Sequence, residues 1–291
     1  MNYNQNTAVS KCPFSSGRMF FKESKAEISE KSFTQNFVKE NSIVREIWGK
    51  SDTILFIFAG AAAEFALNKS VDWLYFTGKL PNDPLGRLFS TVEYARKIVF
   101  ASFDDANNSI DTIRKIHTAV ENKRGFPIPD WAYRDVLFML IYYSIAAFEI
   151  LERKVSDQEK EEVYNVFYRL GDRMGLKNLP LTYIDWLPIR ESHLQENLAK
   201  SNFTDDLFKQ YHKHLGTFRF KILLEAQKLM VPQKVKNLLN FSEFSLLSNA
   251  IPVYKRLKFL NMDELLKRLL LPSKYKEQIN QLNFNSQKKH Q

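Results

Sequence analysis

The stretch DDANNSIDTIRKIHTAVENK, residues 104–123, has the spacing of an amphipathic helix. Four apolar residues and one histidine recur in it at intervals of three or four, namely Ala106, Ile110, Ile113, His117 and Val120. This period places them on one helical face, which we expect to lie against the core of the protein. A histidine on that face needs a partner, because an unpaired buried polar group costs about 1–3 kcal/mol. His117 is therefore the first candidate functional residue.

Two further polar side chains lie close to this histidine on the same helix. Arg114 lies one turn before Thr118, so we expect a guanidinium, an imidazole and a hydroxyl to meet where the helix borders the core. We predict that Arg114, His117 and Thr118 form a ligand-binding group. A histidine whose partners are ordinary core residues is the alternative interpretation.

The composition of the chain predicts an all-α protein with a single domain of many helices. Its 291 residues are 44% hydrophobic, which is enough for a large core, and include only nine glycines and ten prolines. The frequent turn dipeptides of an all-β protein and a Gly/Ser-rich linker are both missing. We expect a helical domain over residues 32–280, with polar tails over residues 1–31 and 281–291.

Helical spacing and capping residues divide this domain into segments. The expected helices cover residues 32–48, 53–67, 85–101, 104–123, 130–152, 161–174 and 204–230. Ser51 and Asp52 can cap the second of these, and Pro84 suits the first turn of the third. Ser156 to Glu159 form a capping box before the sixth. Because the 130–152 segment is apolar on nearly every side, we expect it at the centre of the fold.

Cysteine usage and the apolar runs predict a cytoplasmic protein. The single cysteine, Cys12, excludes an intramolecular disulfide framework and a cysteine-rich metal site. The first residues lack the apolar segment of a signal peptide. The longest apolar runs, Ile54–Ala63 and Val136–Ala147, are shorter than the roughly 20 residues that span a bilayer, so we expect both to be core helices.

The net charge of +9 is spread along the chain, with one regional excess. Residues 251–291 contain nine Lys/Arg and three Asp/Glu, a local excess of six positive charges. We interpret this excess as a solvated basic surface, with contact with an anionic membrane surface as the alternative. No specific nucleic-acid partner is expected.

The five histidines do not match the common metal sites of helical proteins. A carboxylate-bridged di-iron bundle needs Glu-x-x-His pairs, and no histidine here has a glutamate three residues before it. His212 and His214 lie two residues apart and cannot bind one zinc ion from a regular helix. A Gly-rich phosphate loop and a Gly-x-Ser-x-Gly motif are also absent. Haem, which needs one or two axial ligands and an apolar pocket, is the cofactor that these residues allow.

Several segments carry a resemblance to a known family through their order and spacing. They are Asn82-Asp83-Pro84-Leu85-Gly86-Arg87-Leu88-Phe89-Ser90-Thr91, Glu93-Tyr94, Val99-Phe100, Arg114-Lys115-Ile116-His117-Thr118 and Tyr164-x-x-Phe167-x-Arg169-Leu170-Gly171. Over roughly residues 52–240, the chain resembles the catalytic domain of the MpaB and latex-clearing-protein (rubber oxygenase) family of haem-dependent oxygenases.

This resemblance implies an all-α domain with a globin-like helical core and a b-type haem. It also implies dioxygen chemistry on an apolar substrate such as a polyisoprene or terpenoid chain. Arg114 and Thr118 match the polar pair beside the haem in the latex-clearing branch, and His117 falls where that branch has a lysine. Arg87 is expected either to bind a haem propionate or to form a salt bridge with Asp83 at a helix start.

The chain departs from the family at the expected proximal ligand. Most relatives carry a second histidine early in the following helix, whereas Leu137 occupies the aligned position here. The sequence therefore leaves four interpretations open. His117 is the sole strong ligand, Tyr142 or Tyr143 serves as a phenolate, a histidine arrives from elsewhere, or haem has been lost. The histidines available for the third interpretation are His193, His212 and His214.

Two functional hypotheses follow. The first is a haem-b-dependent oxygenase that uses dioxygen on a small or extended apolar substrate. In it His117 binds the iron, Arg114 and Thr118 orient a propionate or the iron-bound oxygen, and Arg87, Tyr142 and Tyr143 are further cofactor-binding candidates. The second is a non-catalytic helical protein that retains the family scaffold and binds an apolar ligand or a protein partner without haem.

Overall fold

The computed structural model describes residues 35–76, 78 and 82–259. The predicted polar tails over residues 1–31 and 281–291 and the cysteine at position 12 lie outside the described residues. So does most of the basic C-terminal region, from residue 260 onward.

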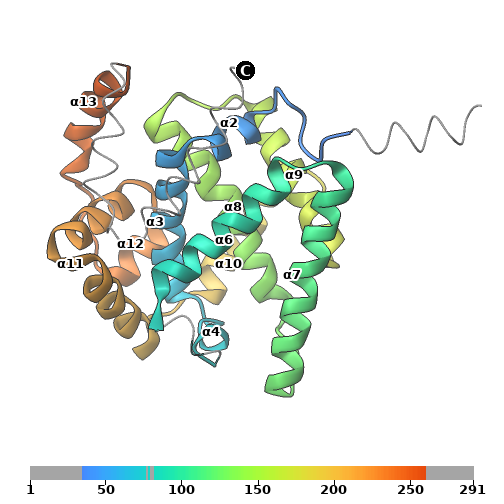
Figure 1. Ribbon diagram of the computed structural model, residues 1–291. Coiled ribbons are helices and arrows are strands. Elements are labelled where there is room, and N and C mark those ends of the chain that lie inside the picture. Colours follow the sequence, from blue (N-terminus) through green and yellow to red (C-terminus); the bar gives the residue numbers. More distant parts are fainter. Residues whose placement is uncertain (1–34, 77, 79–81, 260–291) are drawn as a thin grey trace, which may run out of the picture.

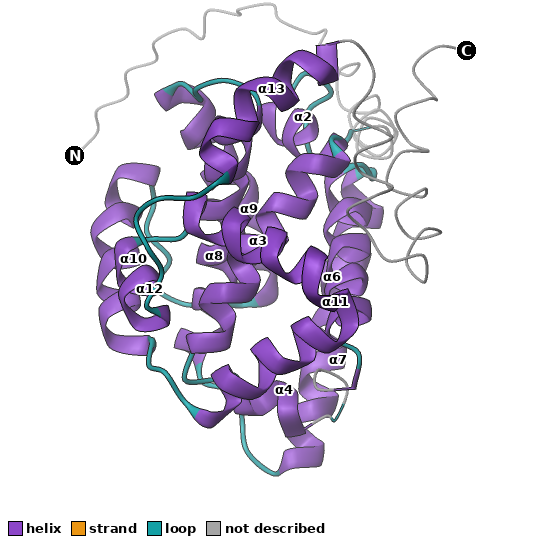
Figure 2. Cartoon of the chain, turned by 90° about the vertical axis from the view of Figure 1, so that its left-hand side faces the viewer, coloured by secondary structure: helices purple, strands orange, loops and turns teal. Residues whose placement is uncertain are grey.

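The described part of the chain is built from helices joined by short loops (Figures 1 and 2). The helices are α2 (Ile43–Gly49), α3 (Ser51–Leu67), α4 (Asp72–Phe76), α6 (Pro84–Val99), α7 (Phe103–Arg124), α8 (Asp130–Leu151), α9 (Asp157–Met174), α10 (Tyr183–Asn197), α11 (Asn202–Met230), α12 (Gln233–Leu239) and α13 (Leu247–Phe259). In place of strands, these residues form two isolated β-bridges, Asn36 with Ser102 and Asn68 with Leu198. The predicted all-α, single-domain class is confirmed, while the globin-like arrangement stays a prediction.

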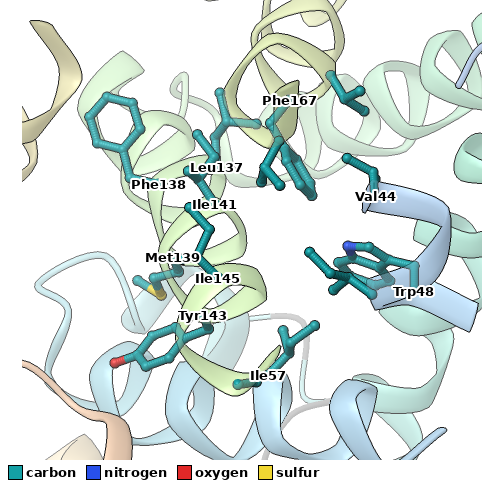
Figure 3. Close-up of a cluster of buried hydrophobic side chains, with 14 of the residues drawn as sticks. Val44, Trp48, Ile57, Leu137, Phe138, Met139, Ile141, Tyr143, Ile145 and Phe167 are labelled. Carbon is teal, nitrogen blue, oxygen red and sulfur yellow. The ribbon is translucent and has the colours of Figure 1, made fainter. Parts of the chain in front are cut away.

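Helix α8 lies at the centre of the domain, as its apolar sequence predicts. It packs against α3 and α9, and α11 covers another side of α3. Figure 3 shows the core where these helices meet α2, with Leu137, Ile141 and Ile145 of α8 near Trp48 and Phe167. All of these side chains are buried because apolar residues occupy successive turns of α8 on more than one side.

Three helix starts test the predicted capping residues. Helix α9 begins with the predicted capping box, in which Ser156 Oγ accepts from the Glu159 amide and the Glu159 carboxylate accepts from the Ser156 amide. Asp83 Oδ1 accepts from the Gly86 amide at 3.1 Å and caps α6, where Pro84 is the first residue. The predicted capping of α3 by Ser51 and Asp52 was wrong. Ser51 is already helical, and the cap residue Lys50 makes no side-chain capping bond.

The predicted helix over residues 32–48 was wrong for residues 35–42, because α2 begins only at Ile43; residues 32–34 lie outside the described part. The residues just before α2 lie alongside the junction between α6 and α7. There the Phe37 amide donates to the Ala101 carbonyl at 3.1 Å, and the Phe103 amide donates to the Gln35 carbonyl at 2.7 Å. These bonds to a distant part of the chain replace the local bonds that a helix would need.

Two features of the C-terminal half were not predicted. Helix α10 was missed, although Thr182 Oγ1 caps it by accepting from the Asp185 amide at 3.2 Å. Helix α11 covers the predicted residues, but Gly216 has φ 72° and ψ 165°, so two helical segments meet there at a kink. Within the described residues, no helix combines the length and apolar character that crossing a membrane would require.

Gly60 allows a close approach between α3, α8 and α11. A Cβ atom at Gly60 would lie 2.3 Å from the Tyr143 ring and 2.7 Å from Met230 Sδ. Tyr143 is fully buried, and its hydroxyl donates to Glu64 Oε2, one turn further along α3, at 2.9 Å. Glycine at this position therefore lets the tyrosine reach a buried carboxylate.

We expect Gly60→Ala to destabilise the protein by about 1–3 kcal/mol, because the new methyl group would overlap the Tyr143 ring. Gly49→Ala is the matched control, since a Cβ there would meet Phe100 at an ordinary contact distance of 3.8 Å. Urea denaturation of both variants measures the free energy of unfolding. Equal effects at the two positions would contradict the proposed overlap.

Candidate functional site

Helix α7 carries the candidate site and lies at one side of the domain (Figure 1). Ser102 Oγ caps it by accepting from the Asp105 amide at 3.2 Å, and it ends at Gly125, which has φ 88°. The predicted inner face is fully buried at Ala106 and Ile110 and half-buried from Ile113 onward. The prediction that this face lies against the core is therefore confirmed for the first half of α7. In the second half, which includes His117, the face is only partly covered.

His117 is half-buried, and its ring contacts the Tyr133 ring of α8 edge-on, with 5.1 Å between ring centroids. Its Nδ1 atom is buried and makes no hydrogen bond to any residue that the structure describes. Burial lowers the pKa of His117, the positive charge of Arg87 lowers it further, and the negative charge of Glu121 opposes both. The neutral imidazole is therefore favoured, with one nitrogen unsatisfied among the described residues.

A cavity of about 150 Å³ adjoins His117 and is partly open to solvent. Its lining residues come from α7, α8 and the end of α9: Arg114, His117, Thr118, Glu121, Asp130, Tyr133, Met174, Gly175 and Leu176. The three predicted site residues thus line one cavity, although Arg114 and Thr118 are exposed at its mouth. Its volume lies below the roughly 300–1,000 Å³ of typical small-molecule sites.

Glu121 joins α7 to α8 beside this cavity. Its Oε1 atom accepts from the Tyr133 hydroxyl at 3.0 Å and from the Ile128 amide at 2.9 Å. Burial and this hydrogen bond raise the pKa of Tyr133, so the phenol stays protonated. Sequence reasoning missed Tyr133, because nothing in the spacing of α8 links its start to the glutamate on α7.

Arg87 on α6 is a largely buried cation near the same histidine. Its guanidinium donates to Thr91 Oγ1 at 2.9 Å and to Ser90 Oγ at 3.3 Å, rather than to the capping carboxylate of Asp83. Burial lowers its pKa. Arg87 forms no ion pair with any residue that the structure describes, so the predicted salt bridge at the helix start is not found there.

The sequence of this domain matches the model of one protein family. The family model described as "ER-bound oxygenase mpaB/B'/Rubber oxygenase, catalytic domain" matches residues 48–259, which run from the end of α2 through α13. The chain belongs to this oxygenase family. No curated protein matched the chain, and no solved structure did either.

The two tyrosines predicted as cofactor ligands lie apart from the cavity of this oxygenase-family domain. The Tyr143 hydroxyl donates to Glu64, and the Tyr142 hydroxyl donates to the Met230 carbonyl at 3.2 Å. Burial raises the pKa of both phenols, which disfavours a phenolate. Leu137, which we expect at the place of the family's second histidine, packs against α9, where a Cβ at Gly171 would lie 2.6 Å from it.

The other candidate histidines of the oxygenase-family domain do not line the cavity either. His193 of α10 pairs through Nδ1 with the buried carboxylate of Asp135 on α8, and its ring contacts Phe138 at 5.1 Å. His212 is exposed, with Nε2 3.1 Å from Thr217 Oγ1, and His214 is half-buried on the same helix.

A buried ion pair crosses the core close to His193. Arg190 of α10 donates to Glu64 Oε2 of α3 at 2.5 Å, and the two side chains are only 5% and 1% exposed. Asp135 accepts from Asn68 and Asn197 in the same region, so α3, α8 and α10 are tied together by polar contacts. Glu64 directly follows the apolar run Ile54–Ala63, and a carboxylate at the end of that run was the available signal that a cation must reach it.

We expect the pKa of His117 to lie below its usual value of about 6.5 and to respond to its two charged neighbours. Arg87→Met should raise this pKa and Glu121→Gln should lower it, whereas exposed Lys115→Met should leave it unchanged. Titration followed by proton NMR of the imidazole measures all three. A shift of the same sign in both variants would contradict the assigned causes.

The lowered pKa also has a consequence for stability. Because the folded state disfavours a proton on His117, its contribution is complete above about pH 6.5 and is lost as the pH falls toward the folded-state pKa.

We expect Arg190→Met to destabilise the protein by about 3–5 kcal/mol, because Glu64 would keep a buried charge without its partner. The double variant Glu64→Gln and Arg190→Met should be less destabilised than this single variant, since it buries no unpaired charge. Denaturation with guanidinium chloride measures both free energies of unfolding. A double variant at least as unstable as the single variant would show that the ion pair is not the source of the loss.

Proposed function

We propose that this protein is a haem-b-dependent oxygenase that uses dioxygen on an apolar, isoprenoid-like or lipid-like substrate. The observation that carries the proposal is His117, an imidazole with a buried and unsatisfied nitrogen beside a cavity in an oxygenase-family domain. A ligand that coordinates this nitrogen would remove the penalty of burying it unpaired.

The residues around His117 fit the needs of a haem. A neutral imidazole is the form that binds a metal, and burial and Arg87 keep His117 in that form. Arg87 is a half-buried cation whose hydrogen bonds, within the described residues, go to hydroxyl groups, so it can take a propionate as its ionic partner. Arg114 at the cavity mouth is the second candidate for a propionate.

The proposed catalytic group is Arg114, His117 and Thr118, which line one cavity. When bound, haem supplies an iron centre that binds and activates dioxygen. His117 would hold that centre, Arg114 would orient a propionate through its charge, and the Thr118 hydroxyl would provide a hydrogen bond at the same edge. Met174 and Leu176 supply the apolar part of the cavity wall.

Tyr142 and Tyr143 take second place as cofactor ligands. Their hydroxyls already donate within the protein, and each would have to give up that bond and its proton to bind iron. We further propose that the helical domain extends over residues 32–280, and that the single cysteine of the chain, Cys12, fits a cytoplasmic location.

A non-catalytic scaffold protein is the second candidate function. Two points favour it: the cavity beside His117 holds only about 150 Å³, and Leu137, expected at the place of the family's second histidine, packs tightly against Gly171. In this version, the cavity takes a small apolar ligand without haem, and His117 is a half-buried residue of its wall.

The two candidates predict different absorption spectra for protein purified from haem-sufficient cells. For the oxygenase we expect a Soret band that is lost in His117→Ala and kept in the control His212→Ala, whose histidine is exposed. Arg87→Met should weaken hemin binding in a titration. Colourless protein that does not take up added hemin would overturn the oxygenase proposal and support the scaffold.

A further inference from the structure

The outer side of α11 carries a concentration of positive charge that the proposed oxygenase site does not use. Residues 207–224 of this helix contain four basic residues and no Asp or Glu, namely Lys209, Lys213, Arg219 and Lys221. The helix runs along the left-hand edge of the molecule in Figure 1 and faces the viewer in Figure 2. Its charge is therefore presented on a surface away from α7.

The kink at Gly216 divides α11 into two segments that each bury one side. Leu207 and Tyr211 of the first segment belong to a small core cluster, and Phe220 of the second packs against the same cluster. The opposite side is exposed and consists of Lys209, His212, Lys213, Thr217, Phe218 and Lys221, which we call the α11 ridge. The bond between His212 Nε2 and Thr217 Oγ1 at 3.1 Å crosses the kink and links the two halves.

Phe218 is the apolar centre of this ridge. Its side chain is 62% exposed, whereas Phe220, two residues later, points inward toward Phe208. A single exposed phenylalanine is common on protein surfaces. Phe218 lies between Lys213 and Lys221 in a run of α11 that contains no acid.

We propose that the α11 ridge docks on a membrane that contains anionic phospholipid. The lysines complement the negative charge of the lipid headgroups, and the Phe218 ring can enter the boundary between headgroups and acyl chains. Nucleic acid is less well matched, because planar arginine forks are the groups best suited to bidentate contacts with phosphate and bases, and the cations exposed here are lysines. Arg219, the one arginine of the run, is half-buried and already interacts within the protein.

Co-sedimentation of the full chain with lipid vesicles tests this proposal. We expect binding to phosphatidylcholine vesicles that contain phosphatidylserine, weak binding to phosphatidylcholine alone, and loss of binding as salt is added. The double variant Lys213→Gln and Lys221→Gln should bind roughly 30-fold more weakly, since each cation near an anionic surface contributes about fivefold. Phe218→Ser should weaken binding about tenfold, and Phe218→Trp should retain it.

Matched controls separate the ridge from the overall charge of the protein. The double variant Lys123→Gln and Lys177→Gln removes an equal number of positive charges, but from exposed positions on α7 and after α9. Ile184→Ser removes an apolar side chain that is 68% exposed on α10. Both controls should bind like the unchanged protein, and circular dichroism should show that all variants keep their helices.

Several results would overturn the proposal. Equal weakening by the lysine control would show that net charge alone attracts the vesicles. Equal binding with and without phosphatidylserine would exclude recognition of anionic lipid. Binding of the ridge to DNA or to an acidic protein, without binding to vesicles, would assign this surface to another class of partner.

Discussion

The close contact of α3 with α8 is the constraint on which the rest of the structure depends. Gly60 lets the Tyr143 ring lie against α3, and the tyrosine hydroxyl then reaches Glu64 inside the core. A carboxylate buried there without a partner would destabilise the folded state, and Arg190 of α10 pairs with it. One missing side chain at Gly60 thus fixes how three helices meet around the apolar cluster of Figure 3.

The candidate site exists because α7 is only partly covered by its neighbours. Its first half is buried, while its second half carries His117 at the border of a cavity that opens to solvent. Two charged groups near this histidine, the half-buried Arg87 and the acid Glu121, act on its pKa in opposite directions. Burial is the largest cause of the lowered pKa, so the neutral imidazole is favoured close to a charged, accessible surface.

The sequence predicted those helices and caps that depend on residues close together in the chain. The first half of the α7 face, the apolar character of α8, Pro84 at the start of α6 and the capping box of α9 are each contained within one segment, and each was confirmed. The three residues expected to meet on α7 also line one cavity, because they share one helix.

Contacts between distant segments were the ones that the sequence could not reveal. The start of α2 was misplaced because residues 35–37 bond to the α6–α7 junction, and α10 was missed because no strong period marks it. The buried partners Arg190 and Tyr133 follow from tertiary packing rather than from spacing along one helix. The family, in contrast, could be predicted from short motifs, because their order along the chain can be read without knowing how the helices pack.

The double role of Glu121 Oε1 has a consequence for how ligands reach His117. One oxygen atom holds both the Ile128 amide in the α7–α8 loop and the Tyr133 hydroxyl on the next helix. Displacement of this carboxylate would therefore release the loop amide and the phenol together. Hydrogen exchange at the Ile128 amide accordingly reports how often the loop beside the imidazole opens.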